Sequence, residues 1–153
     1  MGTIVDVNSE NWPVNIISVK SPSGQALDRA AAGLVCTALL ALTERKQRYA
    51  NIVDLTECGS VSGSERAFIG DDFNEHIEVY RSYVIAVTVV LRSQVLRGVL
   101  TAIGWVHPYP FPLKFVNTLE AGARELKLIL SQQGISWPGL RPLALQPPLV
   151  ASR

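Results

Sequence analysis

Residues 83–91, YVIAVTVVL, constrain the fold more than any other part of the sequence. Thr88 interrupts an otherwise continuous apolar run that is too short to cross a membrane. Such a run is typical of a strand that is covered on both faces or lies at the centre of a sheet. The chain must therefore build a sheet with this segment inside it.

Other patterns place strands and helices around this segment. Further strands are predicted at residues 3–7, 14–20, 50–57 and 113–117. Helices are predicted to begin near Leu27, at the capping box of Ser62 and Glu65, after Ser93, and after Thr118, the last ending at Gly134. This order predicts an α/β fold with a mixed sheet of four or five strands, whose later strands run parallel through right-handed crossovers.

The chain of 153 residues has the length of one domain. We expect a single domain over residues 1–134. Residues 135–153 contain four prolines and no periodic pattern, so they are predicted to form a loosely ordered tail, of which residues 137–153 should be dispensable for folding.

Charge and composition limit the kinds of partner and the cellular location that are expected. A formal net charge of +1 provides no basic stripe, so no nucleic-acid partner is expected. No apolar run reaches the roughly 18 residues of a membrane span, and the first residues lack a signal peptide, which predicts no stable membrane insertion and a cytoplasmic location. Cys36 and Cys58 are too few and too far apart for a disulfide framework or a zinc ribbon.

Several stretches together resemble a known family. The order of NIVDLTE, a helix containing Glu65 and Arg66, YVIAVTVVL, LRSQVLRGVLTAIGW and PFPLKFVNTLEA resembles the SpoIIAA-like, STAS-type domains related to anti-sigma-factor antagonists. The resemblance covers residues 14–130. It implies a small sheet with helices packed mainly on one face, bacterial signalling, and binding of other proteins or, in some relatives, of small apolar ligands.

The antagonists of this family act as phosphorylation switches through an Asp-Ser-Ser-Gly stretch. Matching that stretch to SVSG puts Ser60 in place of the aspartate and Val61 in place of the acceptor serine. Counting from Asp54 instead puts Gly63 at the acceptor position. We therefore expect no phosphorylation switch of the usual kind, although Ser60, Ser62 and Ser64 lie close by as candidate phosphorylation sites.

Candidate interaction residues lie in and around the helix predicted after Ser93. Arg92 and Arg97 could hold a phosphate or an acidic residue of a partner. After that helix, the alternating prolines of WVHPYPFPLKF stiffen a connector. We expect Trp105 and Phe111 to pack inward, with His107 and Tyr109 facing water as interaction residues.

No set of residues indicates catalysis. Asp72 and His76 share a helix face but suit a surface ion pair better than an acid–base pair. The carboxylates Asp71, Asp72, Glu75 and Glu78 suit a solvated face better than a cation site. No phosphate loop, dinucleotide fingerprint or zinc motif is present, so no metal and no cofactor are expected.

These observations predict a non-enzymatic regulatory or scaffolding module that acts through contact with another protein, with a homodimer left open. The alternative is a small apolar-ligand-binding protein that uses a cleft between the first long helix and the sheet.

Overall fold

The apolar run that dominates the sequence forms strand β4 (Val84–Val90), and every residue of this strand is buried. The computed structural model describes residues 2–22, 25–106 and 108–141. Within them β4 lies between β3 (Tyr49–Asp54) and β5 (Leu113–Val116) and is parallel to both. The prediction of an internal strand is confirmed.

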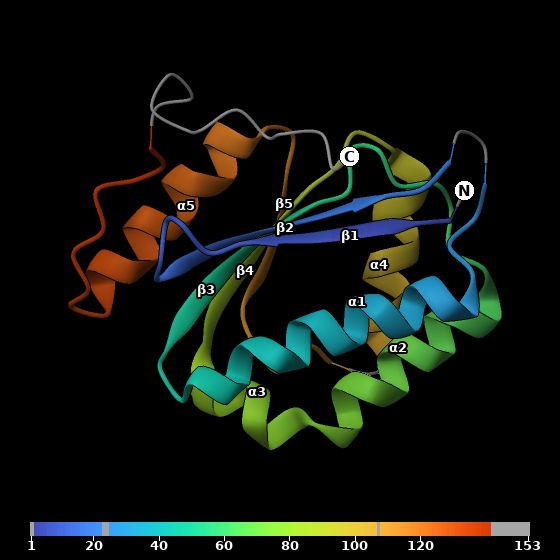
Figure 1. The fold of residues 1–153 in the computed structure, drawn as a ribbon, viewed down its shortest axis with the longest axis horizontal. Helices are drawn as coiled ribbons and strands as arrows, with labels where there is room; N and C mark the ends of the chain where they lie inside the picture. The colour runs from blue at the N-terminus through green and yellow to red at the C-terminus, as the bar shows by residue number, and fades with distance from the viewer. Residues whose placement is uncertain (1, 23–24, 107, 142–153) are drawn as a thin grey trace.

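The sheet has five strands in the order β1-β2-β3-β4-β5 (Figure 1). β1 (Ile4–Asn8) is antiparallel to β2 (Val14–Lys20), and the remaining pairs are parallel. The predicted α/β fold with a mixed sheet is therefore confirmed.

The helices begin where polar side chains can cap them. Their bounds are α1 (Arg29–Leu42), the short 3-10 helix η1 (Thr43–Arg45), α2 (Gly63–Glu75), α3 (Ile77–Tyr83), α4 (Gln94–Val106) and α5 (Leu119–Gln132). The hydroxyl oxygens of Ser93 and Thr118 each accept a hydrogen bond of 3.1 Å, from the amides of Leu96 and Ala121. One helix was expected after Ser62, but the chain changes direction at His76, so α2 and α3 are separate helices.

The helices cover the two faces of the sheet unequally. α1, α2, α3 and α4 share one apolar core with one face, while α5 packs on the other face against β3 and β4. Figure 1 shows α5 on the opposite side of the sheet from α1 and α2. The expectation of helices mainly on one face is confirmed. Among the described residues, no helix is both long enough and apolar enough to cross a membrane.

The segment that follows α5 packs against the loop between β1 and β2. The Trp137 side chain is 4% exposed, and its indole nitrogen donates a hydrogen bond of 3.0 Å to the carbonyl oxygen of Asn11. The amide of Arg141 donates to the side-chain oxygen of Asn11 at 2.9 Å. The expected loose tail is therefore wrong for residues 137–141, which have no regular structure but are anchored. Residues 142–153 lie outside the described residues.

Candidate functional site

α4 combines a buried side with an apolar exposed side. Leu96 and Ile103 are buried, whereas Val95, Trp105 and Val106 are 73%, 81% and 73% exposed. Arg97 is the single charged residue of this thirteen-residue helix, while α5, of similar length, has four charged residues. We call Val95, Trp105 and Val106 the α4 face. Trp105 and Val106 are neighbours at the end of the helix, while Val95 lies about 15 Å away near its start. Exposed apolar residues that lie together can mark interaction sites on soluble proteins.

A groove lies beside the α4 face, between the start of α2 and the end of α4. Its volume is about 230 Å³, and it is lined by Gly63, Arg66, Ala67, Ala102, Ile103 and Val106. Val106 belongs both to the groove and to the α4 face. The exposed apolar surface of α4 thus continues into a depression that could receive a partner's side chain.

The three candidate serines lie around the start of α2, next to this groove, and all three are exposed. The Ser62 oxygen caps the helix by accepting from the Glu65 amide, and its hydroxyl also contacts the Glu65 carboxylate. The Ser64 hydroxyl donates to that carboxylate at 2.7 Å. A phosphate on Ser62 or Ser64 would therefore meet a like charge.

The two candidate arginines differ in their exposure to solvent. Arg92 is exposed just after β4. Arg97 is half-buried, with its guanidinium 5.6 Å from the centre of the Phe115 ring. Arg92 is therefore the better placed of the two to meet an acidic partner.

Tyr109 and Trp105 have the opposite orientations to those expected. The Tyr109 hydroxyl donates a hydrogen bond of 2.6 Å to the carbonyl oxygen of Leu100, and burial raises the Tyr109 pKa to about 12. Trp105 is 81% exposed. The physical reason is Gly104, because a Cβ there would lie 2.8 Å from the Tyr109 ring, so glycine gives the tyrosine its place against α4. Phe111 packs inward as expected, and His107 lies outside the described residues.

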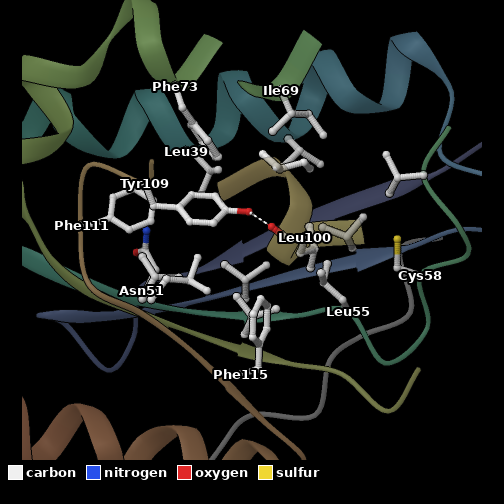
Figure 2. A pocket seen from close by; sticks show the side chains of 18 of the residues that line it. Leu39, Asn51, Leu55, Cys58, Ile69, Phe73, Leu100, Tyr109, Phe111 and Phe115 are labelled. Atoms are coloured by element: carbon white, nitrogen blue, oxygen red, sulfur yellow. Dashed lines mark hydrogen bonds between the residues drawn. The ribbon is translucent and has the colours of Figure 1, made fainter. Parts of the chain in front are cut away.

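A cavity of about 100 Å³ lies between the sheet and helices α1, α2 and α4. Figure 2 shows side chains from both helices and strands pointing into it. Its wall is almost entirely apolar, and it includes Leu39, Ile69, Phe73, Leu100 and Phe115. This space was not predicted in detail, because a cavity depends on packing between side chains that are distant in the sequence.

Asn51 brings an amide group to this apolar wall. Its register partner on β2 is Asn15, and the two side chains are 2% and 0% exposed. The Ser9 hydroxyl donates to the Asn15 oxygen at 2.6 Å, and the Asn15 nitrogen donates to the Asn51 oxygen at 3.1 Å. This chain of hydrogen bonds fixes the orientation of the Asn51 amide and leaves its Nδ2 hydrogens directed elsewhere.

Asp72 and His76 form a contact at the end of α2, as expected. The His76 Nδ1 lies 3.5 Å from an Asp72 carboxylate oxygen and 3.0 Å from the Asp72 carbonyl oxygen. Glu75 is close enough that the three residues could offer one ligand atom each to a metal ion, all within 4.8 Å of one another. Glu75 is exposed, and such surface groups are common without an ion.

The groups near Asp72 do not form a reactive centre. Burial, with a smaller contribution from Asp72, raises the pKa of the Cys36 thiol from 9.0 to about 12. Burial likewise raises the pKa of Tyr80. A thiol with so high a pKa is protonated at neutral pH and is a poor nucleophile.

Comparisons with known proteins agree with this architecture. An anti-sigma factor antagonist from Mycobacterium paratuberculosis has a similar structure, with a TM-score of 0.56 and 15% identity over 82% of this chain and 95% of that one. An uncharacterized protein with a SpoIIAA-like fold from Shewanella loihica has a TM-score of 0.54 and 13% identity, over 82% of this chain and 94% of that one. No protein-family model and no curated protein sequence matches the chain. At these identities the likeness shows the fold, which is SpoIIAA-like, or STAS-type, as the sequence resemblance implied.

Proposed function

We propose that this chain is a non-enzymatic regulatory module that acts in the cytoplasm by binding another protein through the α4 face. The observation that carries the proposal is the exposure of Trp105 and Val106 at the end of a helix with one charged residue. An exposed tryptophan lacks the stabilisation that burial of its large apolar surface would provide. Aromatic side chains are also enriched among the residues that dominate binding energy.

The surroundings of the α4 face suit a protein partner. The groove beside Val106 offers a place for an apolar side chain, and the exposed Arg92, which precedes the other end of α4, can pair with an acidic residue of a partner. The structural neighbour from Mycobacterium paratuberculosis, an anti-sigma factor antagonist, supports a regulatory role through a protein partner. His107 directly follows α4 in the sequence and belongs to the proposed interface on that ground alone.

The test is a binding measurement on a surface variant with a matched control. The variant Trp105→Ser/Val106→Ser removes the apolar side chains of the α4 face. The control Leu128→Ser removes a 58% exposed leucine from α5, on the other side of the sheet. A partner captured from the source organism should bind the double variant about 30-fold or more weakly, the loss expected for a central anchor. It should bind the control as it binds the parent.

The outcome also identifies the type of partner. Sedimentation of the purified protein tests whether a second copy occupies the α4 face, because a dimer would then dissociate in the double variant. Equal binding by the parent and the double variant, with no change in oligomeric state, would disprove the proposal.

A second candidate function is favoured by the cavity. Its apolar wall between α1, α2, α4 and the sheet suits a small apolar ligand, so the chain would act as a carrier or sensor of such a molecule.

A further inference from the structure

We infer that the cavity is a binding site for a small apolar molecule that has one hydrogen-bond acceptor, such as a ketone, aldehyde or ether, held by the side-chain amide of Asn51. This inference rests on the second candidate function and is independent of the α4 face.

The size of the cavity sets an upper limit on the ligand. Its volume of about 100 Å³ is below the roughly 150 Å³ of an engineered apolar cavity that binds benzene. It is also well below the roughly 300 Å³ at which pockets for drug-sized ligands begin. Nucleotides and long-chain lipids are therefore too large, and the ligand must be a compact molecule no larger than benzene.

The polar atoms on the wall select the chemistry. Four lining residues have a polar side-chain atom: Asn51, Cys58, Tyr80 and Tyr109. The Tyr109 hydroxyl is engaged with Leu100. The Cys58 thiol interacts with Ser21, whereas the Tyr80 hydroxyl is buried and has no hydrogen-bond partner among the described residues. Asn51 and Tyr80 therefore both offer a polar group to a ligand, and Asn51 is the one that Figure 2 shows directed into the cavity.

Asn51 can donate a hydrogen bond from its side-chain nitrogen to a ligand in the cavity. Its oxygen already accepts from Asn15, and its Nδ2 donates to no other group in residues 2–22, 25–106 and 108–141. Figure 2 shows this nitrogen pointing toward Tyr109 and Phe111, inside the cavity. A carbonyl or ether oxygen on a ligand in the cavity could accept a hydrogen bond from this nitrogen.

Water suits this space less well than such a ligand. A buried water molecule usually makes about three hydrogen bonds, whereas the wall is almost entirely apolar around the Asn51 amide. A ligand with one acceptor and an apolar body satisfies the amide and also contacts the apolar side chains.

The test compares two probes of nearly the same shape. Cyclopentanone has an acceptor and cyclopentane has none. In NMR titrations of the full chain, both should shift methyl signals of lining residues such as Leu39 and Leu100, and cyclopentanone should also shift the Asn51 side-chain amide signal. Cyclopentanone should bind about fivefold more tightly than cyclopentane, the factor expected for one hydrogen bond.

Two variants separate the parts of the inference. Asn15→Leu/Asn51→Leu replaces both members of the buried pair by apolar groups, a change that is tolerated better than loss of one partner. It should remove the preference for cyclopentanone while cyclopentane still binds. Val53→Phe places a larger side chain at the cavity wall and should weaken both probes.

Each result has a definite meaning. Equal binding of the two probes to the parent would overturn the acceptor class and leave the ligand site standing. Binding of neither probe, in protein whose melting curve shows that it is folded, would overturn both the inference and the second candidate function.

Discussion

The Tyr109 side chain is held by contacts on three sides. Its hydroxyl bonds to Leu100, its ring lies 5.9 Å from that of Phe73 in an edge-to-face arrangement, and it stacks on Phe111 at 6.1 Å. Gly104 makes room for the ring on α4. Tyr109, which was expected from the sequence to face water, is therefore packed against the core. Its substitution should affect folding more than binding.

Removing the Tyr109 hydroxyl should destabilise the protein. Tyr109→Phe keeps the ring but removes the hydroxyl bond to the Leu100 carbonyl, which should lower the free energy of unfolding by about 1 kcal/mol. Urea denaturation measures this change. Tyr83→Phe is the control, because Tyr83 is partly exposed at the end of α3, and its effect should be near zero. Equal effects of the two variants would contradict the role given to the hydroxyl.

The Cys36 thiol should make stability depend on pH in the alkaline range. Its pKa is about 12 in the folded protein against 9.0 for an ordinary thiol. Below pH 9 the Cys36 thiol keeps its proton in both the folded and the unfolded state, so its contribution to stability is complete. Between pH 9 and 12 the unfolded state loses the proton first, so the free energy of unfolding falls as the pH rises.

Urea denaturation between pH 7 and 11 checks this prediction. Cys36→Ala should make the alkaline fall shallower, whatever it does to stability at pH 7. Cys58→Ala should change the slope less, because a hydrogen bond from Ser21 opposes the effect of burial on the Cys58 pKa. An identical slope in the parent and in Cys36→Ala would contradict the assignment.

At the scale of elements, α4 and α5 show how two helices of similar length serve different purposes. α5 has charged residues on its exposed side and packs closely on β4, whereas α4 leaves apolar residues in water. The close packing of α5 depends on Gly122, which lies over Thr88, the polar residue of the buried strand.

Adding one methyl group at this contact should be unfavourable. In Gly122→Ala the new Cβ would lie 2.8 Å from the Thr88 hydroxyl oxygen and 3.4 Å from a Val116 methyl carbon. Overpacking should lower stability by about 1–3 kcal/mol, more than the gain of up to about 1 kcal/mol from the better helix former. Gly33→Ala in α1 meets nothing within 4 Å and should raise the melting temperature. A rise in both variants would show that α5 can move away from the sheet.

At the scale of the whole molecule, the last described residues meet the loop between β1 and β2 at Asn11. Its backbone and side-chain oxygens bind the Trp137 indole and the Arg141 amide, across 126 and 130 positions of sequence. This contact closes one end of the core under α5.

Two tryptophans allow a direct comparison of buried and exposed sites. Trp137→Ala should lower the free energy of unfolding by about 3–5 kcal/mol, the usual cost of truncating a buried aromatic side chain. Trp105→Ala makes the same chemical change at an 81% exposed position and should stay within about 0.5 kcal/mol of the parent. Thermal and urea unfolding measure both. A small effect of Trp137→Ala would restore the expectation of a dispensable tail.

The fold could be predicted from the sequence because local signals agree with it. Periodicity located the strands and helices, and Ser62, Ser93 and Thr118 cap helices as expected. The interaction residues could not be placed in the same way. The orientation of Tyr109 depends on the space left by Gly104, and the burial of Trp137 depends on Asn11, so neither follows from local pattern. The presence of a single charged residue among residues 94–106 was a visible sign of the α4 face.

The strand order of the sheet has a consequence for how the chain assembles during synthesis. Each strand pairs with the one that precedes it in the sequence, so the sheet can grow by one strand at a time as the polypeptide leaves the ribosome. The closure of Trp137 on Asn11 joins the earliest loop to a segment that is made more than a hundred residues later. A nascent chain that ends before Trp137 therefore has all five strands of the sheet but one end of its core still open to water.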